Sequence, residues 1–298
     1  FASRVADLGI SCEACHGPGA RHVDRQQRLA KLPETERQAA LDVEPLAIIQ
    51  PADLDPVRSS QVCGSCHGMK WFDKSEEWTA HGFRYRPGDD LAATTPIIQP
   101  SKLDEQPWLK PVLEKNPDIL GDFFWPDGHI RVTGREYNGL LESPCHQRGE
   151  MSCVSCHSMH DSDPNDQLAR GMRGNRACLQ CHSEIAADLT RHTRHAADSA
   201  GSNCYNCHMP HTAYGLLKAI RGHTIETPDV ATTLKTGRPN ACNLCHLDKT
   251  LDWTAEQLAK RNGRAKPAVP AEHRTTAASV LWLLNGDAGQ RALAAWHM

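Results

Sequence analysis

The segment CVSCHSMH, at residues 153–160, contains a C-x-x-C-H unit, and the same unit recurs as CLQCH at 178–182 and CYNCH at 204–208. Three more copies occur as CEACH at 12–16, CGSCH at 63–67 and CNLCH at 242–246. Together the six copies contain twelve of the thirteen cysteines in the chain of 298 residues. A repeat of this kind indicates that the chain builds one type of site six times.

The spacing within each unit is typical of covalent haem attachment. Two thiols one helical turn apart can each form a thioether with a vinyl group of one porphyrin, and the adjacent histidine then reaches the iron. Structural zinc, disulfides and thioredoxin-like redox pairs also use C-x-x-C, but none of them requires a histidine after every second cysteine. The sequence therefore predicts six haem c groups. The predicted thioether residues are Cys12, Cys15, Cys63, Cys66, Cys153, Cys156, Cys178, Cys181, Cys204, Cys207, Cys242 and Cys245. The predicted proximal iron ligands are His16, His67, His157, His182, His208 and His246.

Composition and charge agree with this interpretation. Only 39% of the chain is hydrophobic and 5% aromatic, which is little material for an ordinary core. Porphyrins, at about one per 50 residues, can replace part of that core.

The formal charge is −3, and with about +1 per ferric centre and −2 per pair of propionates it becomes roughly −9. This balance gives no support for nucleic-acid binding and favours a cationic partner surface. No run reaches the roughly 18 apolar residues of a membrane span.

Histidines outside the six units are numerous enough to provide the sixth iron ligands. Electron carriers usually close both axial positions, and eleven further histidines are present. His160, three residues after His157, cannot fold back over its own haem but can reach a neighbouring one. His22 follows the first unit beyond a Gly-Pro-Gly turn, and the same reasoning applies to it. We therefore expect both to be distal ligands.

Two further distal ligands are expected in the C-terminal half. His192 and His195 stand at i and i+3 of a predicted helix, so one can face a haem while the other is solvated, and His195 is preferred. His223 ends an apolar stretch, with His211 as its local competitor.

The gap at 68–152 provides the remaining candidates, His81 and His129. Either of them could instead be an ordinary surface histidine with no role in iron binding. His146 is the substitute for either of them. His273 and His297 fall in the polar tail, where no role is assigned.

Cys145 belongs to no unit and is interpreted as an unpaired thiol, with a disulfide or an unusual haem contact as alternatives.

The organisation of the chain is predicted to be mainly α-helical with extensive irregular loop. Only about 20 residues separate the third, fourth and fifth units, so their haems must pack closely. Residues 27–42 read as one short amphipathic helix, and the Pro-rich and Gly-rich residues 68–152 as extended loop. Short helices are expected to start at the C-x-x-C-H units. The predicted domains are a hexahaem cytochrome domain at 1–250 and the start of a helical extension at 251–298.

The extension is predicted to contain helices near 253–262 and 271–285, ended by glycines, and a third helix that opens at Asp287. Thr254 with Gln257, and Asp287 with Gln290, resemble capping boxes. The first residues resemble neither an initiator segment nor a signal peptide, so we interpret the chain as a piece of a longer protein.

Several of these segments resemble the multihaem cytochromes related to cytochrome c-554, some of which continue into helical repeats. The resemblance rests on ISCEACHGPG followed by His22, MSCVSCHSMH, HTRH before CYNCHMP, YGLLKAIRGH and RPNACNLCH. It implies bis-histidine haems in stacked and perpendicular pairs, a periplasmic or extracellular location and electron transfer. It also adds support for His22, His160, His195 and His223.

The expected function is electron relay to a redox protein or an extracellular acceptor, and the protein is not expected to be an enzyme. One version of the relay resembles the cytochrome nanowires of metal-respiring bacteria, in which copies of the chain form a conductive filament. The alternative is a multihaem oxidoreductase with one open haem that acts on a small nitrogen or sulfur compound. No nucleic-acid partner is expected.

Overall fold

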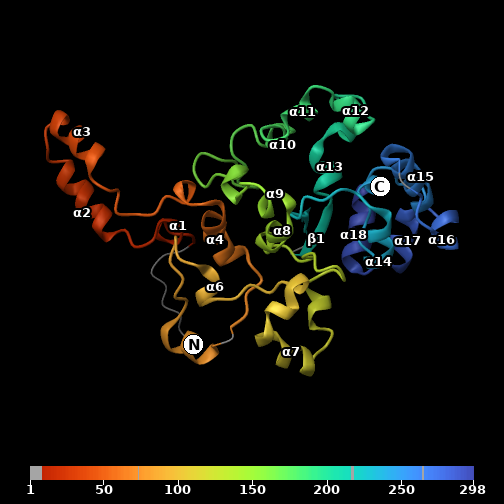
Figure 1. Ribbon diagram of the computed structural model, residues 1–298, viewed down its shortest axis with the longest axis horizontal. Coiled ribbons are helices and arrows are strands. Elements are labelled where there is room, and N and C mark those ends of the chain that lie inside the picture. Colours follow the sequence, from red (N-terminus) through yellow and green to blue (C-terminus); the bar gives the residue numbers. More distant parts are fainter. Residues whose placement is uncertain (1–8, 73, 216–217, 264) are drawn as a thin grey trace.

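Short helices joined by irregular segments make up most of the protein, as the computed structural model shows (Figure 1). It describes residues 9–72, 74–215, 218–263 and 265–298. The α-helices are α1 (Glu13–His16), α2 (Ala20–Leu29), α3 (Glu34–Val43), α4 (Pro56–His67), α5 (Ser75–His81), α6 (Leu91–Thr94), α7 (Lys110–Lys115), α8 (Glu136–Glu142), α9 (Pro144–Gln147), α10 (Arg176–Leu179), α11 (Ser183–Ala186), α12 (Leu189–Thr193), α13 (Cys204–His208), α14 (Val230–Thr236), α15 (Leu251–Asn262), α16 (Ala271–Thr275), α17 (Ala278–Asn285) and α18 (Ala288–His297). The short 3₁₀ helices are η1 (Pro51–Asp53), η2 (Pro100–Glu105), η3 (Pro107–Leu109), η4 (Ile119–Asp122), η5 (Cys153–Ser155), η6 (Ala200–Ser202) and η7 (Cys242–Leu244). Strands β1 (His211–Gly215) and β2 (Lys218–Arg221) pair antiparallel. The prediction of a mainly α-helical fold with irregular loops is confirmed.

An arm made of α2 and α3 projects from the rest of the molecule (Figure 1). The prediction of one helix over 27–42 was wrong, because α2 ends at Leu29 and α3 begins at Glu34. Pro33 stands between them and cannot donate a backbone hydrogen bond, so the first helix cannot continue through it. Nη2 of the buried Arg25 donates to the carbonyl oxygen of Glu44 at 2.7 Å, which ties the two ends of the arm together.

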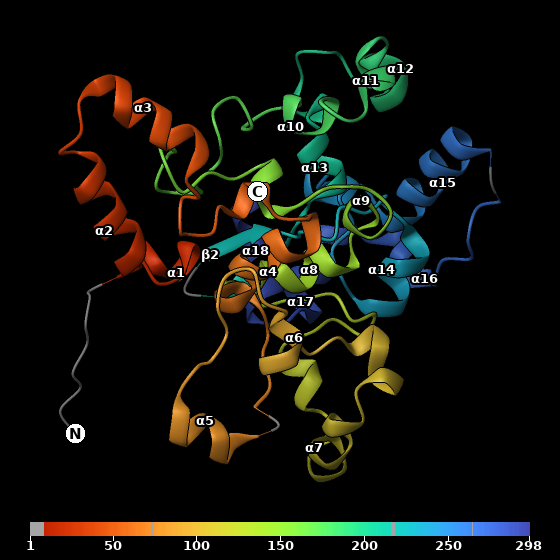
Figure 2. The ribbon, with the colours of Figure 1, turned by 60° about the vertical axis from the view of Figure 1, so that its left-hand side comes forward.

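Residues 68–152 contain several helices, so the prediction of an extended loop held only in part. Helices α5 to α9 fall in this gap, each seven residues or shorter. In Figure 2 the segment from α5 to α7 lies below α4 and α8. The many prolines are placed at helix starts, as at Pro107 in η3 and Pro144 in α9, where a missing N–H costs nothing.

Buried apolar side chains form four small clusters rather than one core. The buried members are Tyr85, Leu91, Ile97, Tyr137 and Leu140 in the first, Leu244, Ala278, Trp282, Leu293 and Ala294 in the second, Ile98, Leu109, Phe124 and Ile130 in the third, and Val230, Leu251, Ala255 and Val269 in the fourth. The chain exposes 18064 Å², whereas a compact protein of this mass exposes about 12,500 Å². The polypeptide alone is therefore an open scaffold, as its low hydrophobic content predicts.

The helices after residue 250 are close to those expected from the sequence. Helix α18 begins with the predicted capping box of Asp287 and Gln290. The other predicted box was wrong, because the side chain of Thr250 caps α15 and Thr254 lies inside that helix, where it donates to Asn243 at 2.8 Å. Helix α15 thus starts earlier than predicted, at Leu251. The second predicted helix is divided into α16 and α17.

These C-terminal helices pack directly on the preceding part of the chain. Trp282 of α17 and Leu293 of α18 share a cluster with Leu244 of the sixth C-x-x-C-H unit, and α18 also contacts β1. The division into domains at residue 250 stays a prediction.

A buried arginine near this contact joins its own segment to a distant one. Arg238, only 4% exposed, donates from Nη2 to Asp127 Oδ2 at 2.8 Å and to Glu226 Oε2 at 2.9 Å. Glu226 also supplies the backbone carbonyl that meets Nδ1 of His208 at 2.8 Å. Because both carboxylates are largely shielded from water, this network stabilises the segment that positions His208.

Replacing Arg238 by methionine is expected to lower the free energy of unfolding by about 3 kcal/mol, since two buried carboxylates lose their cation. Guanidinium denaturation of the purified holoprotein measures the change. The control is Lys260→Met, which removes an exposed ion pair with Glu256 and should leave the denaturation midpoint unchanged. Equal midpoints for all three proteins would contradict the role given to Arg238.

Candidate haem-binding sites

Each C-x-x-C-H unit forms a single helical turn. The units coincide with α1, the end of α4, η5, α10 with the turn after it, α13, and η7. In the first unit, the amide of His16 donates to the carbonyl of Cys12 at 3.0 Å. A turn of this kind places both cysteines on one side and the histidine beside them, as thioether attachment requires. All thirteen cysteines lie in the described ranges, and no disulfide joins any two of them.

Consecutive units lie next to one another in space, beginning with the first three. Helix α1 contacts α4, and α4 contacts η5. The amide of Cys153 approaches Oγ of Ser60 at 3.4 Å. Nε2 of Gln180, in the fourth unit, donates to the carbonyl oxygen of Ser155 in the third at 3.2 Å.

The last three units continue this row. The amide of Cys204 donates to Oδ1 of Asn175, next to the fourth unit, at 2.9 Å. His192 and His195, three residues apart, face the histidines of the fifth and sixth units, which places these two units next to each other. The spatial order of the six units therefore follows their order in the chain, which the sequence alone did not reveal.

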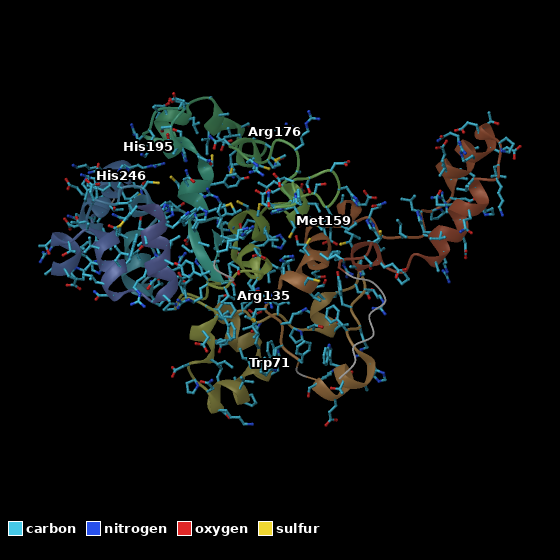
Figure 3. The ribbon with its side chains drawn as sticks, turned by 180° about the vertical axis from the view of Figure 1, so that it is seen from behind. Trp71, Arg135, Met159, Arg176, His195 and His246 are labelled. Carbon is cyan, nitrogen blue, oxygen red and sulfur yellow. The ribbon has the colours of Figure 1, made fainter. Side chains whose placement is uncertain are left out.

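Four of the six unit histidines face a second histidine ring. The ring centroids are 6.1 Å apart for His16 and His160, 6.3 Å for His157 and His223, 6.1 Å for His208 and His192, and 6.1 Å for His246 and His195. The rings within each pair are within 22–32° of parallel. Figure 3 shows His195 and His246 side by side where the segment after α12 meets the C-terminal helices.

The spacing of these pairs fits coordination of one metal ion between two imidazoles. With metal–nitrogen bonds of about 2.0 Å and a ring nitrogen about 1.1 Å from its centroid, two opposed ligands have centroids about 6.2 Å apart. Ordinary aromatic pairs have centroids about 4.5–7 Å apart, so the argument rests on the recurrence of nearly the same spacing at four unit histidines. The residues present therefore fit a haem with histidine on both faces.

The other ring nitrogen of most paired histidines is held by a backbone carbonyl. Nδ1 meets the carbonyl oxygen of Ile49 for His16 (2.7 Å), Asp166 for His157 (3.1 Å), Glu226 for His208 (2.8 Å), Thr193 for His195 (2.8 Å) and Arg221 for His223 (3.0 Å). Such a contact assigns the proton to Nδ1, orients the ring and leaves Nε2 free to bind metal.

Two glycines make room for the opposed rings. A Cβ atom at Gly201 would collide with the ring of His195, and one at Gly139 in α8 would come within 3.0 Å of Cβ of His223. Close approach of the backbone explains glycine at both positions.

His192 was not the preferred ligand from the sequence, yet its ring faces His208 while that of His195 faces His246. The expectation that one of the two is solvated assumed a continuous helix. Helix α12 ends at Thr193, and Arg194 adopts a left-handed conformation with φ of 63°. The chain therefore turns between the two histidines, and each can face a different unit.

His67 and His182 differ from the other four unit histidines. Within the described ranges, no second histidine ring is opposed to either of them at the spacing of the four pairs. Nδ1 of His67 meets Oε2 of Glu136 at 2.8 Å. Nδ1 of His182 lies 3.7 Å from Oε1 of Glu184, beyond hydrogen-bonding distance.

Two histidines outside the four pairs have the same backbone anchor as the paired ones. Nδ1 of His22 meets the carbonyl oxygen of Leu46 at 2.6 Å, and Nδ1 of His146 meets that of Met151 at 2.7 Å. Their Nε2 atoms are therefore free in the same way.

The other two predicted ligands have different surroundings. His81 is exposed at the end of α5. His129 is half-buried beside Asp127 and Glu226, with Nδ1 3.5 and 3.6 Å from their carboxylates. Burial lowers the pKa of His129. Within the described residues, neither His81 nor His129 is among the four opposed pairs, and their role as ligands stays a prediction.

No described helix has the length and apolar character needed to cross a bilayer. Likewise, the described residues contain no group of three or more His, Cys, Asp or Glu side chains arranged to hold a metal ion.

Comparisons with known proteins agree with the haem interpretation. Residues 164–257 match the family model described as cytochrome c7 and related cytochrome c. The whole chain superposes on 70% of the outer cell wall cytochrome OcwA with a TM-score of 0.52 and 17% sequence identity. No curated protein sequence matches significantly. Residues 164–257 thus resemble the c7-type cytochromes, and this match, together with the C-x-x-C-H units and the shared fold, supports a multihaem c-type cytochrome with covalently bound haem c.

Proposed function

We propose that this cytochrome transfers electrons through six haem c groups, one at each C-x-x-C-H unit. The observation that carries the proposal is the set of four histidine pairs, each spaced for one metal ion. Haem c, when bound, supplies an iron that takes up and releases one electron.

The protein's own residues hold each site in a fixed geometry. The cysteines anchor the group on one helical turn, and the carbonyl-anchored histidines fix the direction of the ligand nitrogen. Closed, rigid coordination suits electron transfer, because little rearrangement accompanies a change of charge. Since adjacent units are in contact along the chain order, the six sites form one continuous row.

We assign His22 and His146 to the two units that lack an opposed ring. The carbonyl oxygen that anchors His146 belongs to Met151, two residues before the third unit, and Gln180 of the fourth unit donates to Ser155 of the third, so this segment lies near both units. His146 is therefore assigned to the fourth unit, which contains His182. His22 follows the first unit, whose helix α1 contacts α4, so His22 is assigned to the second unit, with His67.

The likeness to an outer cell wall cytochrome supports a periplasmic or extracellular location and exchange of electrons with a redox protein or an extracellular acceptor. The acidic balance of the holoprotein favours a cationic partner surface. In the filament version, His22 in the projecting arm would serve the haem of a neighbouring copy.

Replacement of Cys178 and Cys181 by serine is expected to lower the haem content from six to five per chain, because the fourth group loses both thioether bonds. The pyridine haemochromogen assay with protein quantification measures this. The matched control is Cys145→Ser, which alters a thiol beside the same units and should keep six. Six haems in the double variant would contradict the assignment.

His192→Ala and His195→Ala are each expected to convert one haem in six to the high-spin state, and the double variant two in six. Each change removes one axial ligand and leaves both thioether bonds in place. Low-temperature EPR of the oxidised proteins measures the fractions, with His273→Ala as the control. A change in only one of the single variants would show that the other histidine is solvated.

The high-spin fraction of the oxidised protein, measured over a dilution series, distinguishes three functions: a relay within one chain, a filament and an enzyme. With His22 and His146 bound within one chain, the oxidised protein should be wholly low-spin at every concentration. A high-spin fraction that grows on dilution is the result expected of a filament. A constant high-spin fraction that shifts on adding nitrite or sulfite would indicate an enzyme with an open haem.

A further inference from the structure

The proximal histidine of the second unit differs from the others in what holds its Nδ1 atom. We propose that the Glu136 carboxylate makes His67 a more strongly donating ligand, so that the haem of the second unit has the lowest reduction potential in the row. Glu136 is thus a positioning residue that acts through His67. The inference rests on the proposed binding of a haem at His67.

The contact between Glu136 and His67 is direct and well supported. Oε2 of Glu136 meets Nδ1 of His67 at 2.8 Å, and Oε1 accepts the amide of Gly134 at 2.7 Å. The side chain of Glu136 is 22% exposed, and the residue opens α8, where the helix dipole favours an anion. Gly134 has φ of 79°, a conformation that glycine adopts without strain. Both carboxylate oxygens are therefore fixed.

No other unit histidine in the described residues has a carboxylate at this distance. Neutral backbone carbonyls meet Nδ1 of His16, His157 and His208 at 2.7–3.1 Å. The two histidines are about equally exposed, His67 at 53% and His182 at 51%, but the Glu184 carboxylate is 3.7 Å from His182 and 72% exposed, so it makes no hydrogen bond and is screened by solvent. His246 instead packs against the ring of Trp253, with centroids 4.9 Å apart.

A carboxylate acceptor draws the Nδ1 proton towards itself and leaves more negative charge on the imidazole. The extra charge at Nε2 stabilises the ferric form more than the ferrous form, which lowers the reduction potential. During reduction one electron is added, and the Nδ1 proton stays in the hydrogen bond. The nearby cation Arg135, labelled in Figure 3, acts in the opposite direction, but its charge is the same in the wild type and in the Glu136 variants, so it does not alter the difference between them.

The test is spectroelectrochemical titration of the holoprotein with dithionite as the electron source. Glu136→Gln keeps a hydrogen-bond acceptor of the same size but removes its charge. We expect the lowest midpoint potential to rise so that reduction of that haem becomes at least about tenfold more favourable, which is about 59 mV for one electron. The other five midpoints should stay in place, and the EPR signal of one low-spin haem should shift.

The matched control is Glu142→Gln, at the other end of α8, where the carboxylate accepts from Gln99 and Ser101 and touches no unit histidine. A second variant, Glu136→Asp, keeps the charge but withdraws it from Nδ1, and should give a smaller rise. Unchanged midpoints in Glu136→Gln with six haems retained would overturn the role of Glu136 and leave the haem assignment intact. A wild-type protein without haem at Cys63 and Cys66, detected by peptide mass spectrometry, would overturn the proposed function instead. If Glu136→Gln fails to mature, the aspartate variant and its midpoint decide the question.

Discussion

The spacing between opposed histidine rings is the constraint on which the rest of the structure depends. Four pairs have centroids 6.1–6.3 Å apart, the separation that one metal ion between two imidazoles requires. The pair of His16 and His160 joins segments far apart in the sequence, as does that of His157 and His223. Each pair brings one unit next to a different segment, so in the proposed coordination each haem would also crosslink the fold.

This arrangement explains why so few apolar residues suffice. The four buried clusters are small and separate, and the chain exposes far more surface than a compact protein of its mass. Elements that would otherwise need a shared core are held instead by backbone carbonyls on histidines, by the Arg238 network and by contacts between successive units. Stability and function therefore rest on the same residues.

Local patterns in the sequence predicted much of the site, and tertiary turns decided the rest. The six units, the helical class and the capping box at Asp287 are local signals, and the structure places His160, His195 and His223 opposite unit histidines as the sequence suggested. The use of His192 depends on the left-handed turn at Arg194, which helical periodicity cannot reveal. The contact of Glu136 with His67 joins residues 69 positions apart, so no spacing rule could have predicted it. The helix break at Pro33 could have been predicted, because the proline was visible in the sequence.

The measurement that tests the account most directly is quantitative low-temperature EPR of the oxidised holoprotein, scaled to haem content. The four opposed pairs require at least four of the six haems to be low-spin, and the assignment of His22 and His146 predicts that all six are. A high-spin fraction above two in six would show that at least one opposed pair does not ligate iron, and would contradict the central claim.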